Sequence, residues 1–281
     1  ARALRNRAMT ANINDICAPL DISLDYDKDV LPISCVGEGG SVTERHLLFA
    51  LAHKLMTAYG KGRDLLTVLR EKLLLSIPEK TALLLIDEEN PYYDYDLLGL
   101  LKAELVSKIY IDANENECLD VREYLAFVNK IGALSCAAYL GDVKDSVTGD
   151  KKAQKFEDDY LEELFAYYGE LGFDGISYMP SRNSASQLER GRALCRLNGL
   201  LQISGEDINQ PRQSFVCKAA RDPSFANLIE STWALIGSEL SGTENLESSM
   251  VSARSRARCP GLEERVAAFA KIGRERFDQS V

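Results

Sequence analysis

The sequence contains few histidines, no long apolar run and no cluster of basic residues. Only two histidines occur among 281 residues, and no apolar run approaches the roughly 20 residues that a helix needs to cross a bilayer. The formal net charge is −10 and the sequence pI is about 4.9. Because an acidic surface repels phosphate groups unless a basic patch overrides it, we expect neither a nucleic acid nor a membrane as partner.

The cysteines lack the CxxC spacing of zinc sites and redox motifs. Seven are scattered along the chain, and Cys136, Cys195 and Cys217 lie in apolar segments. This pattern predicts reduced, mostly buried thiols in a cytoplasmic protein. The chain also opens without a methionine or a signal-peptide pattern. It begins at Ala1 in a helix-like run that has no obvious N-cap, so we expect a further segment upstream.

The chain divides into four segments that differ in hydrophobic periodicity and composition. The apolar content of 46% is sufficient for a large core in one or two domains. Residues 1–40 have a mixed pattern and are treated as an N-terminal segment. Apolar residues three and four positions apart predict helices through residues 41–105, which we interpret as a helical insertion. Residues 106–235 contain the short apolar runs of a βα portion, and residues 236–281 combine a Ser/Glu-rich linker with a C-terminal helix.

The stretch from Leu171 to Phe215 predicts a strand, a helix and a second strand. An apolar run from Gly175 to Met179 is followed by helical periodicity from Ser186 to Leu197 and by a second apolar run from Leu200 to Ser204. This spacing is typical of a parallel sheet, in which ligands bind beyond the carboxyl ends of the strands. The polar residues that we expect to share such a rim are Arg182, Asn183, Glu206, Asp207, Asn209 and Arg212.

Two earlier runs also predict strands. Lys108 to Ile111 precedes a polar loop and a helix from about Leu119 to Ile131, and Gly132 to Leu140 has the small and apolar residues of a strand buried on both faces. The glycine-flanked loop that follows the second run ends in lysines, including Lys151. It could contact an anion, or it could simply connect to an amphipathic helix over residues 153–171.

Three further patterns have both a structural and a functional interpretation. The loop from Asp112 to Glu123 imitates an EF-hand calcium loop, but Glu117 stands where the sharp turn needs glycine, so we prefer a polar loop. The histidines, His46 and His53, lie about 10 Å apart along a helix at 1.5 Å per residue, too far to bind one zinc ion, and are interpreted as helix-surface residues.

The third pattern is a glycine cluster, Gly37 to Gly40, in front of Ser41 and Glu44. Such a cluster can bind phosphate at the start of a helix. However, a serine followed three residues later by a glutamate is first of all a capping box, in which each side chain satisfies a backbone N–H group of the other residue. We therefore prefer the helix cap.

Several motifs occur in the same order in a known family of enzymes. They are Gly40-Ser41-Val42-Thr43-Glu44-Arg45-His46, Ile131-Gly132-Ala133-Leu134, Ala138-Tyr139-Leu140, Gly172-Phe173-Asp174-Gly175-Ile176 and Gly205-Glu206-Asp207-Ile208-Asn209. Residues from about Gly39 to Phe215 thereby resemble the C-terminal two-thirds of the PHP (polymerase and histidinol phosphatase) family. The resemblance implies a distorted seven-stranded βα barrel with two or three divalent metal ions, commonly zinc, manganese or iron. It also implies hydrolysis of phosphate esters by metal-activated water.

The family's closing Gly-Ser-Asp-x-His motif corresponds to residues 205–209. The resemblance makes Asp207 a metal ligand and catalytic residue, while Asn209 replaces a histidine and would be a weaker ligand for a transition metal. Tyr139 replaces the histidine of an Ala-His-Pro strand end. The family's opening His-x-His motif is not found in the chain. We therefore predict an α/β fold that is a partial or distorted TIM-like PHP barrel with a helical insertion and C-terminal helices, and an incomplete metal centre.

Three functions follow as hypotheses. The first is a divergent metal-dependent phosphoesterase acting on a phosphorylated small molecule, with Asp207 and Asn209 at the metal. Its substrate-binding residues would be Arg182, Asn183, Arg212 and Lys151, since the arginine fork matches phosphate oxygens in pairs. The second is a catalytically inactive module of the same type that binds a phosphorylated ligand.

The third hypothesis is a lyase or isomerase that uses Glu206 and Asp207 as an acid–base pair. Neighbouring residues of an extended strand point to opposite faces, which weakens this idea. A purely structural role is also open, in which Asp207 caps the turn after the strand and forms salt bridges with Arg182 and Arg212.

Overall fold

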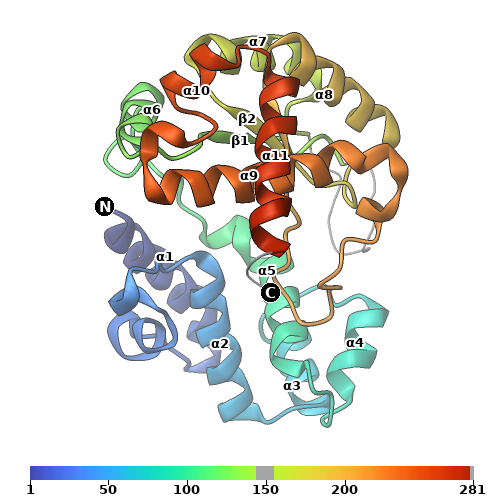
Figure 1. Cartoon of the computed structure of the whole chain (residues 1–281). Coiled ribbons are helices and arrows are strands. Elements are labelled where there is room, and N and C mark those ends of the chain that lie inside the picture. Colours follow the sequence, from blue (N-terminus) through green and yellow to red (C-terminus); the bar gives the residue numbers. More distant parts are fainter. Residues whose placement is uncertain (144–154, 279–281) are drawn as a thin grey trace. The chain divides into compact units, whose positions relative to one another are not determined.

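The computed structural model describes residues 1–143 and 155–278, with the side chains of 277 and 278 excepted (Figure 1). The chain divides into two compact units. Unit 1 comprises Ala1–Leu119 together with Gln210–Gln213, and unit 2 comprises Asp120–Asn209 and Ser214–Val281. Hydrophobic clusters form separately within each unit. No helix in the described part of the chain is both long and apolar enough to span a membrane.

The regular secondary structure in the described residues of unit 1 is helical, without strands. Its helices are α1 (Arg2–Cys17), α2 (Glu44–Tyr59), α3 (Arg63–Glu71), α4 (Glu79–Ile86) and α5 (Tyr93–Ile109). Leu47, Leu51 and Leu55 of α2 recur every four residues and are fully buried, because this spacing places them on one face of a helix. They share one core with α5 and with Met9 and Ile13 of α1, so the N-terminal 40 residues pack with the helices that follow them.

Two local predictions in unit 1 were wrong. The capping box at the start of α2 is formed by Thr43 and His46, whose Nδ1 accepts a hydrogen bond from the Thr43 N–H group at 3.1 Å, rather than by Ser41 and Glu44. The strand expected from Lys108 to Ile111 is absent, because α5 continues to Ile109 and the next residues are irregular.

The loop that resembles an EF-hand is held by arginines. Glu117, at the position where a calcium loop needs glycine, accepts hydrogen bonds from Arg5 at 2.6 and 2.7 Å and from Arg2 at 2.9 Å. Its side chain is only 7% exposed. The preference for a polar loop over a calcium site agrees with this arrangement.

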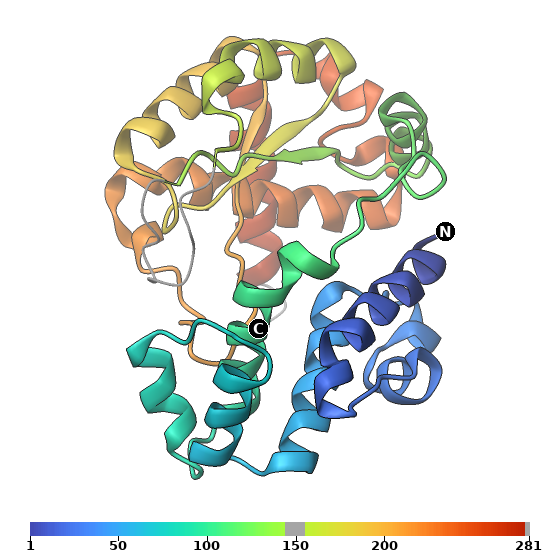
Figure 2. The ribbon, with the colours of Figure 1, turned by 180° about the vertical axis from the view of Figure 1, so that it is seen from behind.

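Unit 2 contains a parallel sheet of three strands between helices (Figures 1 and 2). Its elements are α6 (Val121–Lys130), β1 (Cys136–Ala138), α7 (Leu161–Leu171), β2 (Gly175–Tyr178), α8 (Ala185–Leu197), β3 (Leu201–Ser204), α9 (Ala226–Glu244), α10 (Ala253–Arg258) and α11 (Leu262–Asp278). The strand order is β1-β2-β3, with Cys136 beside Gly175 and Gly175 beside Leu201. The predicted strand, helix and strand are therefore confirmed as β2, α8 and β3.

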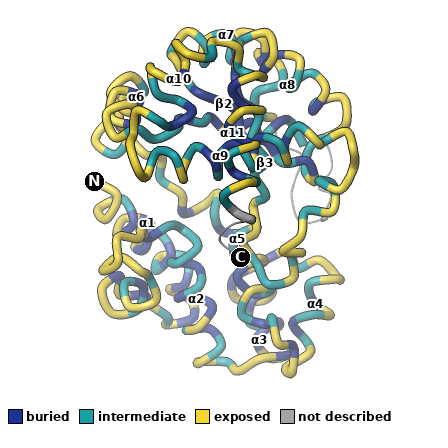
Figure 3. Tube along the Cα trace, viewed as in Figure 1, coloured by how far each residue is buried: buried dark blue, intermediate teal, exposed yellow. Residues whose placement is uncertain are grey.

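Alternate residues of the strands face different helices. Ile176 and Tyr178 pack in one cluster with Phe165 of α7 and Leu194 of α8. Leu201 of β3 packs instead with residues of α9 and α11. This alternation follows from the two-residue period of a strand, and it explains why β2 is buried along most of its length (Figure 3).

The predicted barrel is wrong. Within the described residues the sheet has three strands and is open, and most of the chain is helical. Closing a barrel requires every strand to have a neighbour on both sides, whereas β1 and β3 each pair with β2 alone. The architecture of unit 2 is a small open parallel sheet with helices on both faces.

Helices α9 and α11 approach each other closely through two glycines. A Cβ atom added to Gly237 would lie 2.0 Å from the carbonyl oxygen of Phe269, and one added to Gly273 would lie 2.2 Å from that of Trp233. Backbone atoms thus occupy the space that any side chain would need. Ala234 and Ala270 are fully buried nearby, and Figure 1 shows α11 crossing α9.

Candidate functional site

The carboxyl ends of the three strands form a polar rim in unit 2. Chain segments 139–142 follow β1, 179–183 follow β2 and 205–209 follow β3. Since the strands are parallel, these segments emerge at the same edge of the sheet. Gly205 donates its N–H group to the carbonyl oxygen of Tyr178 at 3.0 Å, which extends the pairing of β2 and β3 to the rim.

The turn after β2 is bound to the turn after β1. The Nε atom of Arg182 and the Nδ2 atom of Asn183 both donate to the carbonyl oxygen of Leu140, at 3.0 and 2.7 Å. The guanidinium carbon of Arg182 also lies 5.4 Å from the centre of the Phe156 ring, a cation–π distance. The structure therefore brings these two predicted residues together and fixes the arginine in a half-buried position.

The turn after β3 contains the two predicted metal ligands, Asp207 and Asn209, and a second acidic side chain, Glu206. Asn209 donates from Nδ2 to the carboxylate of Asp207 at 3.1 Å. The neighbouring Glu206 accepts from the Ser181 hydroxyl at 2.5 Å and from the Cys217 thiol at 3.1 Å. Because Glu206 and Asp207 have these different partners, we do not propose them as an acid–base pair.

The thiol beside Glu206 is not activated. Burial and the hydrogen bond to the Glu206 carboxylate both raise the pKa of Cys217 above its ordinary value, since each disfavours a thiolate. Cys217 therefore acts here as a hydrogen-bond donor that helps to hold Glu206, together with Ser181 from the turn after β2.

Two carboxylates that the sequence did not single out organise the loop after β1. Glu157 accepts hydrogen bonds from the N–H groups of Leu140 and Gly141 at 3.2 and 3.0 Å. Asp158 accepts from the Tyr139 hydroxyl at 2.7 Å, from the Asp142 N–H group at 3.1 Å and from Gln187 at 2.6 Å. They follow no local motif and lie 16 to 29 positions away from these partners, so only the fold reveals them.

The pKa values at this loop reflect the same contacts. Burial alone would raise the pKa of Asp158, but hydrogen bonds from Tyr139, Gln187 and Asp142 hold it below its ordinary value. Burial and the bond to Asp158 raise the pKa of Tyr139 far above its ordinary range. Tyr139 is therefore a neutral donor at the place where the resemblance would have a histidine.

Two predicted residues remain, Arg212 and Lys151. Arg212 belongs to unit 1, where it donates to Asp96 at 2.7 and 2.9 Å and to Asn90 at 2.9 Å. The salt bridge expected between Arg212 and Asp207 is thus replaced by one with Asp96. Lys151 lies outside the described residues.

The donor atoms of the rim fit a divalent cation only in part. Asp207 offers carboxylate oxygens and Asn209 an amide oxygen, which are the hard donors that suit manganese better than zinc or iron. Among the residues that the structure describes, no group of three or more His, Cys, Asp or Glu side chains is arranged to hold a metal ion. A resident centre of two or three metals, as the resemblance implies, would need further ligands.

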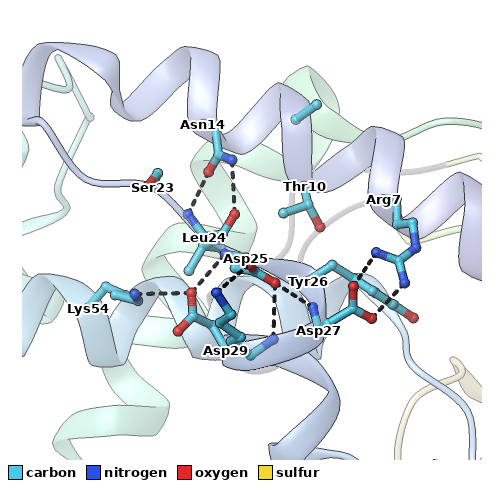
Figure 4. A pocket seen from close by; sticks show the side chains of 12 residues that line it. Arg7, Thr10, Asn14, Ser23, Leu24, Asp25, Tyr26, Asp27, Asp29 and Lys54 are labelled. Carbon is cyan, nitrogen blue, oxygen red and sulfur yellow. Dashed lines mark hydrogen bonds and ion pairs between the residues drawn. The ribbon is translucent and has the colours of Figure 1, made fainter.

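Unit 1 contains a polar pocket that the sequence analysis did not predict (Figure 4). Its volume is about 680 Å³, and its charged lining residues are Arg7, Asp25, Asp27, Lys28, Asp29 and Lys54. Asp25, Asp27 and Asp29 stand at alternate positions of the sequence. The backbone forms a turn of π-helix there, Tyr26–Val30, which Asp25 caps by accepting from the Asp27 and Lys28 N–H groups at 2.9 and 3.1 Å.

The charges of this pocket compensate one another. Arg7 forms two hydrogen bonds with Asp27, at 2.6 and 2.7 Å, and lowers the pKa of that carboxyl group. Lys54 lies 3.0 Å from Asp29. Burial would raise the pKa of Asp29, but bonds from the Asp25 N–H group and Lys54 lower it overall. Each of these carboxylates already has a partner, so the pocket does not indicate a particular ligand.

Comparisons of the chain with protein-family models, with curated proteins and with solved structures found no match. The function is therefore argued from the chemistry of the rim.

Proposed function

We propose that this protein is a divergent metal-dependent phosphoesterase that binds a phosphorylated small molecule at the rim of unit 2. The observation that carries the proposal is the hydrogen bond between Ser181 and Glu206. It joins the turn that presents Arg182 to the turn that presents Asp207, so a phosphate-binding cation and acidic side chains belong to one edge of the sheet.

Arg182 is the residue proposed to bind phosphate. Its Nε atom is held by the Leu140 carbonyl group, and the terminal nitrogens of a guanidinium group match phosphate oxygens in pairs. Asn183, anchored to the same carbonyl oxygen, keeps the two turns together and thereby positions the arginine.

The acidic side chains of the rim favour a phosphate that arrives with a cation. Five acidic residues lie on or next to the rim segments: Asp142, Glu157, Asp158, Glu206 and Asp207. Their negative charges would repel a phosphate that arrives without a cation. Magnesium and manganese ions are commonly held by one or two carboxylates together with the phosphates of the substrate. Asp207 is the residue proposed to contact such an ion, which would polarise the phosphorus–oxygen bond and activate water.

The proposal is tested by hydrolysis of p-nitrophenyl phosphate with and without Mn²⁺. We expect turnover that requires the ion and falls to background in Asp207→Ala. Arg182→Ala should raise KM about 10- to 100-fold, because a charge-assisted hydrogen bond contributes about 1.5–3 kcal/mol. The matched control is Arg196→Ala, an exposed arginine at the end of α8 away from the rim, which should leave KM unchanged.

A second candidate is binding without hydrolysis. It is favoured by the incomplete ligand group within the described residues. Titration calorimetry with p-nitrophenyl phosphate and Mn²⁺ separates the two candidates. Heat of binding that disappears in Arg182→Ala, without any release of nitrophenol, would support the module that only binds. If neither binding nor turnover depends on Arg182, both functions are wrong.

A further inference from the structure

A small cavity lies at the opposite ends of the strands from the rim. Its volume is about 30 Å³, which is enough for one or two water-sized particles. The residues that line it precede or open the strands or come from the C-terminal segment: Leu134, Phe173, Asp174, Gly199, Leu201, Met250, Val251, Arg256, Leu262 and Arg265. Most of these side chains are apolar, so the charged ones dominate the electrostatics of the cavity.

Arg265 lines the cavity and is incompletely paired. The residue is 7% exposed, and its Nε atom is buried without a hydrogen-bond acceptor. One terminal nitrogen donates to the carbonyl oxygens of Cys259 and Pro260, at 2.7 and 3.1 Å. These neutral acceptors leave the positive charge of the side chain without a counter-ion of its own.

The single carboxylate of the lining already has partners for both of its oxygens. One oxygen of Asp174 pairs with Arg256, and the other accepts from the N–H group and the hydroxyl of Ser135 at 2.7 and 2.8 Å. Two guanidinium groups therefore face one carboxylate, and the lining has an excess of one positive charge. Burial, with the nearby charge of Arg256, lowers the pKa of Arg265, which reflects the cost of a buried cation without an opposite charge.

We propose that this cavity binds one small monovalent anion of the size of chloride, held by Arg265 with Arg256. An anion between the two guanidinium groups would neutralise the excess charge, while the small volume of the cavity excludes larger ligands. A polyatomic anion such as phosphate does not fit a space of one or two water molecules. The site is independent of the proposed phosphoesterase function, because it shares no residue with the rim.

Crystals of the full chain grown in sodium bromide test the site directly. We expect an anomalous scattering peak in the cavity beside the guanidinium group of Arg265, because bromide replaces chloride and scatters anomalously. An ordered water in its place, without an anomalous signal, would overturn the proposal.

Unfolding in solution provides the second measurement. The midpoint is compared in sodium chloride and sodium gluconate at equal ionic strength, with Trp233 fluorescence as the reporter. The midpoint of the natural protein should rise with chloride concentration, since a ligand that binds only the folded state stabilises it. Arg265→Met should remove this dependence, whereas Arg258→Met, which changes an exposed arginine of α10, should retain it.

Equal chloride dependence in the natural protein and in Arg265→Met would contradict the proposal. If Arg265→Met does not fold, the bromide experiment on the natural protein decides the question by itself.

Discussion

The contact between α9 and α11 makes a sharp prediction about Gly237. A methyl group introduced by Gly237→Ala would lie 2.0 Å from the Phe269 carbonyl oxygen and 2.8 Å from the backbone nitrogen of Gly273. Contacts between carbon atoms are optimal at about 3.5–4.0 Å. Because the nearby atoms belong to the backbone of α11 and cannot rotate away, the helices themselves must separate.

The expected loss of folding free energy is the difference between an overpacking cost and a gain in helix propensity. Overpacking costs about 1–3 kcal/mol where side chains can adjust, and we take about 3 kcal/mol because the obstruction is backbone. Alanine recovers about 1 kcal/mol of helix propensity relative to glycine. The net destabilisation of unit 2 is therefore about 2 kcal/mol, which corresponds to a fall of about 4–8 °C in Tm for a domain of this size.

The single tryptophan provides a local assay. Trp233 lies on α9 next to this contact, with the guanidinium carbon of Arg274 5.8 Å from its ring centre, so its fluorescence follows the unfolding of unit 2. The matched control is Gly169→Ala in α7, where an added Cβ would be 3.5 Å from the nearest atoms of Asn198. That change should stabilise unit 2 by about 1 kcal/mol. The reasoning is refuted if Gly237→Ala unfolds at or above the temperature of the natural protein.

Three further changes have expected outcomes. Asp174→Asn should destabilise unit 2 by about 2 kcal/mol, measured by urea unfolding with tryptophan fluorescence, because it leaves the half-exposed Arg256 without its charged partner. Hydrogen bonds from two arginines, chiefly Arg5, lower the pKa of Glu117 to about 2, so the unfolded state binds the proton more readily. The stability of unit 1 should fall as pH drops from about 4.5 towards 2, and Glu117→Gln should flatten this dependence in urea titrations followed by circular dichroism. Leu74 has a φ of 53° and is 79% exposed. Leu74→Gly should raise the free energy of unfolding by about 0.5–1 kcal/mol, measured as a higher urea midpoint, because the relief of left-handed strain exceeds the entropy cost of glycine.

Local sequence signals were sufficient to predict β2, α8 and β3 at the centre of unit 2. Ser184 caps α8 and Gln187 completes a capping box, and these residues lie immediately after the turn that ends β2. The predicted strand at Lys108 failed because Leu101, Leu105 and Ile109 continue the four-residue spacing of α5, which the β-like composition of the following residues obscured. The barrel failed because strand pairing is a long-range property that short apolar runs do not specify.

The positions of the rim residues were predicted where these residues follow strands directly. Arg182 and Asn183 meet at Leu140, and Asp207 lies beside Asn209. Arg212 also follows β3, but its partner Asp96 is 116 positions away, and no pattern in the sequence connects the two. The carboxylates at 157 and 158 were missed for the same reason, since their hydrogen bonds join distant segments.

The assignment of Gln210–Gln213 to unit 1 limits how the protein can be dissected. A fragment that ends at Leu119 would retain all the helices of that unit and yet lose Arg212. Asp96, whose side chain is 7% exposed, would keep only the amide of Asn90 as a donor from this group. A buried carboxylate deprived of its cation is strongly destabilising. Truncation at the apparent boundary should therefore yield a fragment that proteases degrade more readily than the same helices in the intact chain.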